Sequence, residues 1–220
     1  MRISKIVLIV LVSILSLTLL AQGILAATST ATVTFTEDTS TPPVLDPDDG
    51  SLPDPAIPGT GQAGPLSLDY VTGLNFGSQI VSLETMTYEA NELKPFIQVT
   101  DKRGNPTGWK VTVSASAFTS ASTDTLEGAY LEFNNGELVK DSENPSLPPA
   151  IATTFILTTN NAAFKFMNAQ PNSGRGSWIT RWYPLVGVET NDSVTLTVIG
   201  GTMRAEAYTS TLTWTLTDAP

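Results

Sequence analysis

The sequence contains no cysteine and no histidine. Without cysteine there can be no disulfide, thiolate nucleophile or thiolate metal ligand, so the core alone must hold the fold. Without histidine the usual proton shuttle is missing, which excludes Ser–His hydrolysis and histidine-ligated zinc. These two absences remove most of the common hydrolytic chemistries.

Paired carboxylates are the remaining route to catalysis, because a glycosidase needs only two acids that flank the sugar bond. Acids of the C-terminal part that could serve are Glu84, Glu89, Glu92, Asp101, Glu127, Glu132 and Glu137. Their spacing singles out no pair, and scattered acids ordinarily form a solvated surface. We therefore expect a protein that is not an enzyme and has no cofactor and no metal site.

Basic residues are few, 11 against 21 acidic ones. Arg2 and Lys5 belong to the first residues of the chain, so removing a leader there would leave a net charge of 9 − 21 = −12. An acidic protein of this kind is a poor ligand for nucleic acid and for anionic membrane surfaces, both of which attract basic patches. We expect neither as a partner.

One long apolar run is present, at residues 6–20, after the two basic residues and before several small ones. This order is typical of a secretory signal peptide, which we place at 1–27 with cleavage near Ala26 or Ala27. An uncleaved membrane anchor is the alternative, because the run can be extended past Gln22 to roughly spanning length. Cleavage predicts a secreted, extracellular protein without stable membrane insertion.

Two short regions precede the main domain. Residues 28–36 alternate Ala31, Val33 and Phe35 with threonines, which predicts a short strand. Residues 37–65 hold seven of the 15 prolines, six acids and no lysine or arginine. Proline lacks a backbone donor and like charges repel, so this segment is predicted to be an extended, disordered and solvated linker.

Residues 66–220 carry a continuous all-β pattern that predicts a single β-sandwich of the immunoglobulin-like kind. Strands are expected at 66–71, 79–83, 96–101, 109–116, 129–133, 151–158, 163–167, 178–183, 193–199 and 208–217. Asn135-Gly136 is typical of a two-residue hairpin turn. Helical periodicity is weak, although residues 86–93 could form a turn or two.

The last strand, 208–217, is the most strongly patterned stretch. Leu212, Trp214 and Leu216 share one face and threonines share the other, which predicts a strand deep inside the sheet. Trp109 similarly alternates with Val111 and further apolar residues, so both tryptophans are expected in the core.

A second aromatic cluster contains Trp178, Trp182 and Tyr183, framed by glycines and a proline. The surroundings are less apolar, so surface exposure and core packing remain equally open. These three residues are the candidates for direct contact with a ligand.

The motifs Trp109-Lys-Val111 and Trp214-Thr-Leu216, with the leader and the Pro/Asp-rich segment, resemble the WxL-domain family of surface proteins of low-GC Gram-positive bacteria. Val111 departs from the leucine usual in the first motif, and we expect its packing to be retained. The resemblance implies non-covalent attachment to the cell wall through peptidoglycan. It also implies a surface complex with other WxL proteins and a membrane-anchored partner.

Two functional hypotheses follow. In the first, the protein is a secreted, non-enzymatic module that attaches to peptidoglycan directly. In the second, it is a structural subunit of a surface complex, attached to the wall through a partner protein, and the strand expected at 28–36 pairs with that partner's sheet edge. Sedimentation with stripped peptidoglycan separates them, because only the first hypothesis predicts binding without a partner.

Overall fold

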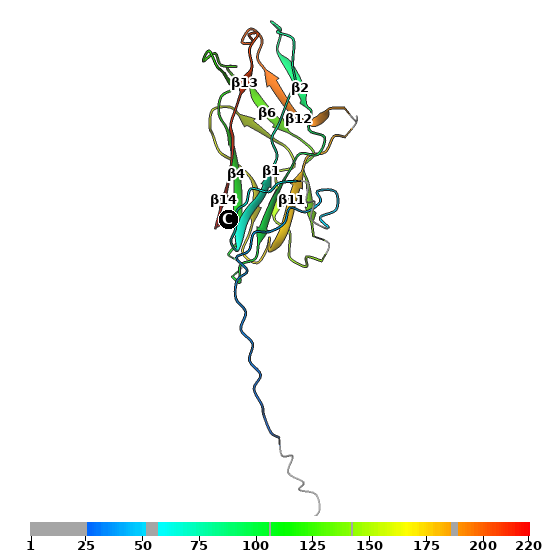
Figure 1. Cartoon of the computed structure of the whole chain (residues 1–220), viewed down its shortest axis with the longest axis vertical. Coiled ribbons are helices and arrows are strands. Elements are labelled where there is room, and N and C mark those ends of the chain that lie inside the picture. The colour runs from blue at the N-terminus through cyan, green and yellow to red at the C-terminus, as the bar shows by residue number, and fades with distance from the viewer. Residues whose placement is uncertain (1–25, 52–56, 106, 142, 186–188) are drawn as a thin grey trace, which may run out of the picture. The chain divides into compact units, whose positions relative to one another are not determined.

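A computed structural model describes residues 26–51, 57–105, 107–141, 143–185 and 189–220 (Figure 1). Contacts divide the chain into two units, residues 1–35 and 36–220. The predicted signal peptide lies almost entirely outside the described residues. No helix in the described ranges is long and apolar enough to cross a membrane.

Residues 26–35 of the first unit are exposed and carry no strand. The strand predicted at 28–36 is therefore not formed in this structure. A strand needs a neighbour that accepts its backbone hydrogen bonds, and within the described residues no other segment pairs with this one. Val33 and Phe35 remain 75% and 87% exposed.

The second unit is built from strands in its described residues, which confirms the all-β prediction. The strands are β1 (Leu66–Val71), β2 (Met86–Ala90), β3 (Phe96–Asp101), β4 (Trp109–Ala115), β5 (Thr119–Ser120), β6 (Tyr130–Phe133), β7 (Glu137–Lys140), β8 (Ala150–Ile151), β9 (Phe155–Thr158), β10 (Phe164–Ala169), β11 (Gly176–Arg181), β12 (Asn191–Val198), β13 (Tyr208–Thr209) and β14 (Leu212–Thr217).

Antiparallel pairing joins these strands into three four-stranded sheets and one pair. The sheet orders are β1-β3-β11-β7, β14-β4-β10-β8, β2-β12-β6-β9 and β13-β5. In Figure 1, β2, β6, β12 and β13 lie in the upper part of the domain, and β1, β4, β11 and β14 lie in the lower part. The two parts are described below as the cleft end and the motif end.

The main core lies between the sheets. Strand β4 shows the expected alternation, because Trp109, Val111 and Val113 are fully buried while the residues between them are half-buried. The core continues into a cluster of aromatic rings around Trp182, whose ring centroid lies 5.1 Å from that of Phe133. Burial of such large side chains is the main stabilising contribution available to a domain without disulfides.

Strand β3 is buried along its whole length because both of its faces are covered. Ile97 and Val99 face the main core, whereas Phe96 packs in a second cluster with Val44 and Leu45. The segment 43–50, which we call the strap, therefore lies against the outer face of β3 and β11. The segment 37–65 is not solvated along its whole length.

Polar groups of the sheet hold the strap in place. The buried Gln98 amide accepts a hydrogen bond from the backbone N–H of Leu45 at 2.8 Å and donates one to the carbonyl of Pro43 at 2.8 Å. Gly50 adopts a φ of +70°, and a Cβ there would lie 2.3 Å from the carbonyl oxygen of Lys140. Glycine is thus required where the strap turns past β7.

Several predicted strands differ from the structure. No strand forms at 79–83, and the helical turn suggested at 86–93 is wrong because that stretch contains β2. The expected strand at 151–158 is interrupted and becomes β8 and β9. Short runs of this kind carry too few residues for periodicity to separate strand from helix or loop. Strands β5 and β7 were not predicted.

The turn at Asn135-Gly136 is not a hairpin. Asn135 has the positive φ of 58° that the motif favours. However, β6 and β7 on its two sides pair in different sheets. The N–H of Gly136 donates to the carbonyl of Thr153 at 2.8 Å, so the turn transfers the chain from one sheet to the other.

The final strand also differs from the prediction. It is split into β13 and β14, and β14 is an edge strand of its sheet. Leu212, Trp214 and Leu216 do share one face, but each is only partly buried. The strict threonine alternation reflects an edge with one wet face rather than a central strand.

Candidate functional site

The two tryptophan motifs lie on neighbouring strands. In the antiparallel register of β4 and β14, Leu216 lies opposite Val111 and Trp214 lies opposite Val113. Residues about a hundred positions apart in the sequence therefore form one continuous piece of sheet. Trp109 and Val111 are fully buried, so the first motif builds the domain interior and presents no surface to a ligand.

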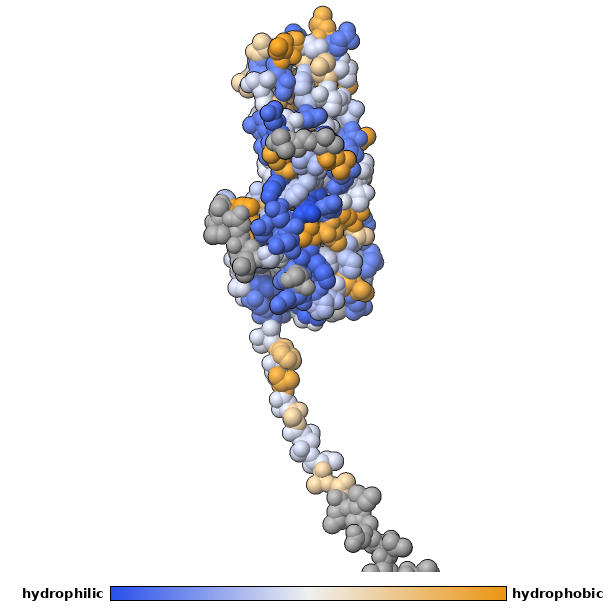
Figure 2. All heavy atoms as spheres, turned by 90° about the vertical axis from the view of Figure 1, so that its right-hand side faces the viewer, coloured by the Kyte–Doolittle hydropathy of each residue, from blue (hydrophilic) through white to orange (hydrophobic). Residues whose placement is uncertain are grey.

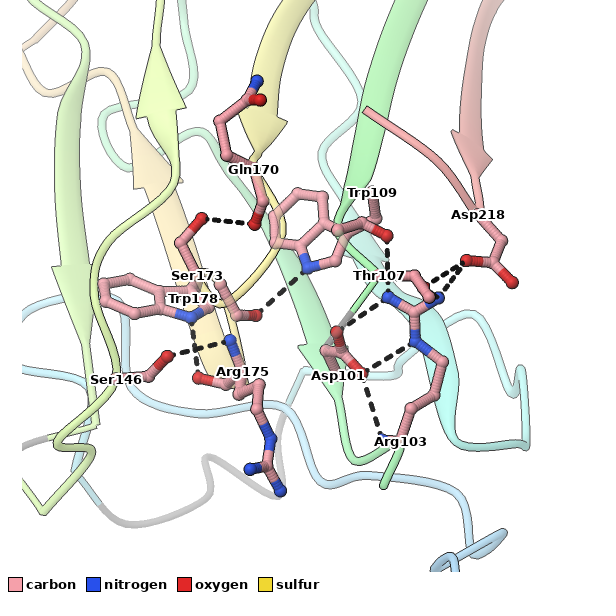
Figure 3. A network of polar contacts seen from close by, with 12 residues as sticks. Asp101, Arg103, Thr107, Trp109, Ser146, Gln170, Ser173, Arg175, Trp178 and Asp218 are labelled. Carbon is pink, nitrogen blue, oxygen red and sulfur yellow. Dashed lines mark hydrogen bonds and ion pairs between the residues drawn. The ribbon is translucent and has the colours of Figure 1, made fainter. Parts of the chain in front are cut away.

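The indole of Trp109 is fixed by a hydrogen bond. Its Nε1–H donates to the carbonyl of Gly174 at 3.0 Å, as Figure 3 shows. Gly174 has a φ of +74°, and a Cβ there would approach Trp109 Nε1 to 2.9 Å and the Cβ of Ala169 to 2.4 Å. A larger residue at 174 would displace the indole.

A buried ion pair lies beside this indole (Figure 3). The Arg103 guanidinium donates to both carboxylate oxygens of Asp101, at 3.0 and 2.8 Å, and to the carbonyl of Gly108 at 2.8 Å. It also donates to Asp218, which follows β14. The hydrogen bonds that Arg103 donates to the Asp101 carboxylate raise the pKa of Arg103. The cluster fastens the turn after β3 to the end of the chain.

The candidate contacts Trp178 and Trp182 do not lie on the surface. They are 2% and 0% exposed, and Trp178 Nε1–H donates to the carbonyl of Arg175 at 3.0 Å. Contact with a ligand outside the fold is therefore not possible for either indole in this structure. Both indoles pack in the main core, and the strap covers the opposite face of β11 at Ile179. This two-sided covering is a long-range feature that local composition does not reveal.

Tyr183 is half-buried and binds the strap. Its hydroxyl donates to Asp48 Oδ1 at 2.6 Å, and the guanidinium carbon of Arg181 lies 4.5 Å from its ring centroid. Burial, followed by the hydrogen bond to Asp48, raises the pKa of the Tyr183 phenol. Lys94 pairs with Asp48 at 2.6 Å and lies 5.8 Å from the same ring. Part of Tyr183 remains accessible.

An open cleft of about 1130 Å³ lies at the cleft end. Its walls are two extended stretches, 71–81 and 203–210. Its floor is apolar and comes from side chains of β2, β6, β12, β14 and the loop after β5: Tyr88, Leu126, Leu131, Leu196, Val198, Leu212 and Trp214. Glu206 is the single carboxylate among the described lining residues.

Nothing in the sequence pattern pointed to this cleft. The stretch 79–83 was expected to be a strand of the sandwich, and in the structure it runs beside the domain as a wall instead. Ile80 and Leu83 are 90% and 84% exposed. Figure 2 shows hydrophobic side chains exposed at this end of the domain.

Comparison with known proteins gives the chain's family. No curated protein matches it in sequence. A family model described as "WxL domain surface cell wall-binding" matches residues 25–220, which include the strap, both tryptophan motifs and the cleft. That match places the protein at the cell surface, attached to the wall. The chain belongs to the WxL family of surface cell-wall-binding domains.

Proposed function

We propose that this protein is a secreted, non-enzymatic module that attaches to the wall by binding peptidoglycan through its folded domain. The family match over residues 25–220 carries the proposal, because it assigns wall binding to the domain as a whole. Trp109 and Val111 support the fold from inside, so the contact with the wall must be made by other, exposed groups.

The disposition of the acids supports a role without catalysis. In the described residues, the buried carboxyl groups are those of Asp69 and Asp101. Each is engaged by side chains of its own domain, and neither lines the cleft. The cleft offers Glu206 alone, whereas glycoside hydrolysis uses two opposed carboxyl groups.

The accessible part of Tyr183 is our candidate for an aromatic contact with the glycan. An aromatic contact contributes about 0.5–1.5 kcal/mol, so Tyr183→Ala should weaken wall binding about twofold to twelvefold. Asp48→Ala is the matched control, because it removes the hydroxyl's partner and leaves the ring. Equal losses in both variants would show that the strap, and not the ring, matters for binding.

Sedimentation with purified, protein-stripped peptidoglycan tests the main proposal. The mature chain should pellet without any partner. Because that chain is acidic, binding to teichoic-acid-bearing walls should hold steady or improve as salt shortens the screening length to about 8 Å. A protein that stays in the supernatant would refute direct attachment.

The second candidate function is that of a structural subunit whose wall attachment is indirect, with other WxL proteins or a membrane-anchored protein as partners. The cleft favours it, because its volume exceeds the roughly 300–1,000 Å³ usual for small-molecule sites and its floor is largely apolar. This candidate predicts that the protein pellets with peptidoglycan only when its partner is added.

A further inference from the structure

Each wall of the cleft includes a stretch of backbone edge that pairs with no other strand in the described chain. In the described chain, residues 76–83 make no backbone–backbone hydrogen bond with any segment. On the other wall, β13 pairs with β5 through one edge. Residues 119–120 of β5 do not line the cleft although 203–210 do, so the second edge of β13 faces the opening.

The space between these walls has the properties of a strand position. Beneath it, Leu131, Leu196 and Val198 of the sheet β2-β12-β6-β9 present an apolar floor, and above it the cleft is open. An extended segment placed there could bond to an edge on each side and bury alternate side chains against the floor. Such an occupant should be apolar on one face and polar on the other.

Residues 28–36 have this pattern, and they pair with no segment in the part of the chain that the structure describes. Residues 28–36 carry Ala31, Val33 and Phe35 on one face and threonines on the other, and they contain no charged residue. Nine residues of strand span about 30 Å. The absence of charge matters, because two copies of a protein this acidic repel one another unless their contact is neutral.

The point at which this segment joins the domain favours a second copy over the same one. Asp38 pairs with Lys102 at 3.0 Å, and the carbonyl of Thr39 accepts from the N–H of Gly64 at 3.1 Å. These contacts lie beside the Leu66 end of β1, and the cleft begins at its Val71 end, about 17 Å away for a six-residue strand.

The three residue steps from Phe35 to Asp38 cover only about 10 Å of extended chain. The largest apolar residue of the segment therefore falls short of the Val71 end of its own domain. We infer that residues 28–36 of one copy insert as a strand into the cleft of a second copy, between residues 76–83 and β13. The contact is head-to-tail, so it leaves a cleft and a segment open at the two ends of each chain of copies.

This inference rests on the cleft being a protein-binding site, the second candidate above, and it is independent of peptidoglycan binding. Sedimentation velocity of the mature chain should show oligomers that grow with concentration up to the millimolar range. The double variant Val33→Asp/Phe35→Asp should be monomeric throughout. Its matched control, Thr32→Asp/Thr34→Asp, adds the same charge to the outward face and should still assemble.

Mixing two disabled variants tests the direction of the contact. The Val33→Asp/Phe35→Asp chain has an intact cleft, and Ala207→Trp, on the exposed wall of the cleft, should block it while leaving the segment intact. Each should be monomeric alone, and together they should form a one-to-one complex that grows no further.

Three results would overturn the inference. The first is a mature chain that stays monomeric at millimolar concentration, including a monomer whose residues 28–36 are protected from hydrogen exchange within the same copy. The second is a set of oligomers that persist in the Val33→Asp/Phe35→Asp variant. The third is the absence of a complex when the two disabled variants are mixed. The wall-binding proposal is judged separately, because the monomeric Val33→Asp/Phe35→Asp chain should still pellet with peptidoglycan.

Discussion

The motif end and the cleft end of the domain are both built from strands, but they differ in whether their hydrogen-bonding groups have partners. At the motif end, the buried Arg103 and Trp109 donate to Asp101 and to the carbonyls of Gly108 and Gly174. At the cleft end, residues 76–83 and one edge of β13 lack sheet partners in the described chain. A buried polar group needs a hydrogen-bond partner within the fold, whereas an exposed strand edge is free to pair with a strand from another molecule.

This contrast separates the first tryptophan motif of the family from the exposed edges of the cleft. The first tryptophan motif is buried at the motif end, which we call the closed half of the domain, and it stabilises the fold there. The second motif spans both ends: Leu216 lies beside Val111, and Trp214 reaches the floor of the cleft. Stability should therefore fall most on substitution at the motif end, and association should respond most at the cleft end.

The largest effect is expected from Trp109→Ala, which should lower the free energy of unfolding by about 3–5 kcal/mol, the usual cost of removing a fully buried tryptophan. The change also leaves the carbonyl of Gly174 without its donor. Urea unfolding followed by circular dichroism measures it. A loss under 1 kcal/mol would show that the motif end is not the stabilising part of the domain.

A smaller loss, about 3 kcal/mol, is expected from Asp101→Ala, because removing one partner leaves the buried Arg103 charge poorly compensated. The matched control is Asp218→Ala, on the other side of the same guanidinium. The Asp218 side chain is 65% exposed, so its removal should cost about 1 kcal/mol or less. Equal losses of unfolding free energy in the two variants would mean that the exposed Asp218 stabilises Arg103 as much as the buried Asp101 does.

Next in size is Trp214→Ala, with an expected loss of about 2 kcal/mol, because this indole is only partly buried on an edge strand. If Trp214 forms the floor of a strand-binding cleft, the variant should also weaken self-association of the mature chain. A loss as large as that of Trp109→Ala would erase the difference between the two motifs.

The motif end of the domain could be predicted from the sequence better than the cleft end. The alternation around Trp109 on β4 is local and strict, and it identified both the strand and its buried face. The same pattern around Trp214 is as regular, yet β14 lies at an edge. Periodicity reports which residues share a face, but it does not report how many neighbours a strand has.

The strap and the Arg103 cluster could not be predicted for a related reason. Val44 and Leu45 lie in a proline-rich acidic stretch and become buried only because Phe96 and Ile179, far along the chain, leave an apolar face open. The Arg103 cluster likewise includes Asp218, 115 residues away. Both involve residues far apart in the sequence, and the composition of a local stretch does not indicate which distant residues it will contact.

The smallest expected effect is a pH dependence of stability that comes from Asp69. It tests whether the strap is packed as firmly as the motif end. The carboxyl of Asp69 accepts hydrogen bonds from Ser67 and Gln98 at 2.6 and 2.8 Å, on the side of the sheet where Gln98 also binds the strap. Burial raises the pKa of Asp69 above its ordinary value, more than these hydrogen bonds lower it.

Because the folded pKa is higher than the unfolded one, the contribution of Asp69 to stability is fully present below the unfolded pKa and is lost as the pH rises through the folded pKa. Asp69→Asn cannot ionise and should remove this dependence. The difference in unfolding free energy between the parent and this variant, measured in urea from pH 4 to pH 7, should therefore shift against the parent as the pH rises, since the titrations of all other carboxyls cancel in it. Parallel curves would mean that water reaches the carboxyl, so that the strap opens and belongs with the exposed edges of the cleft end.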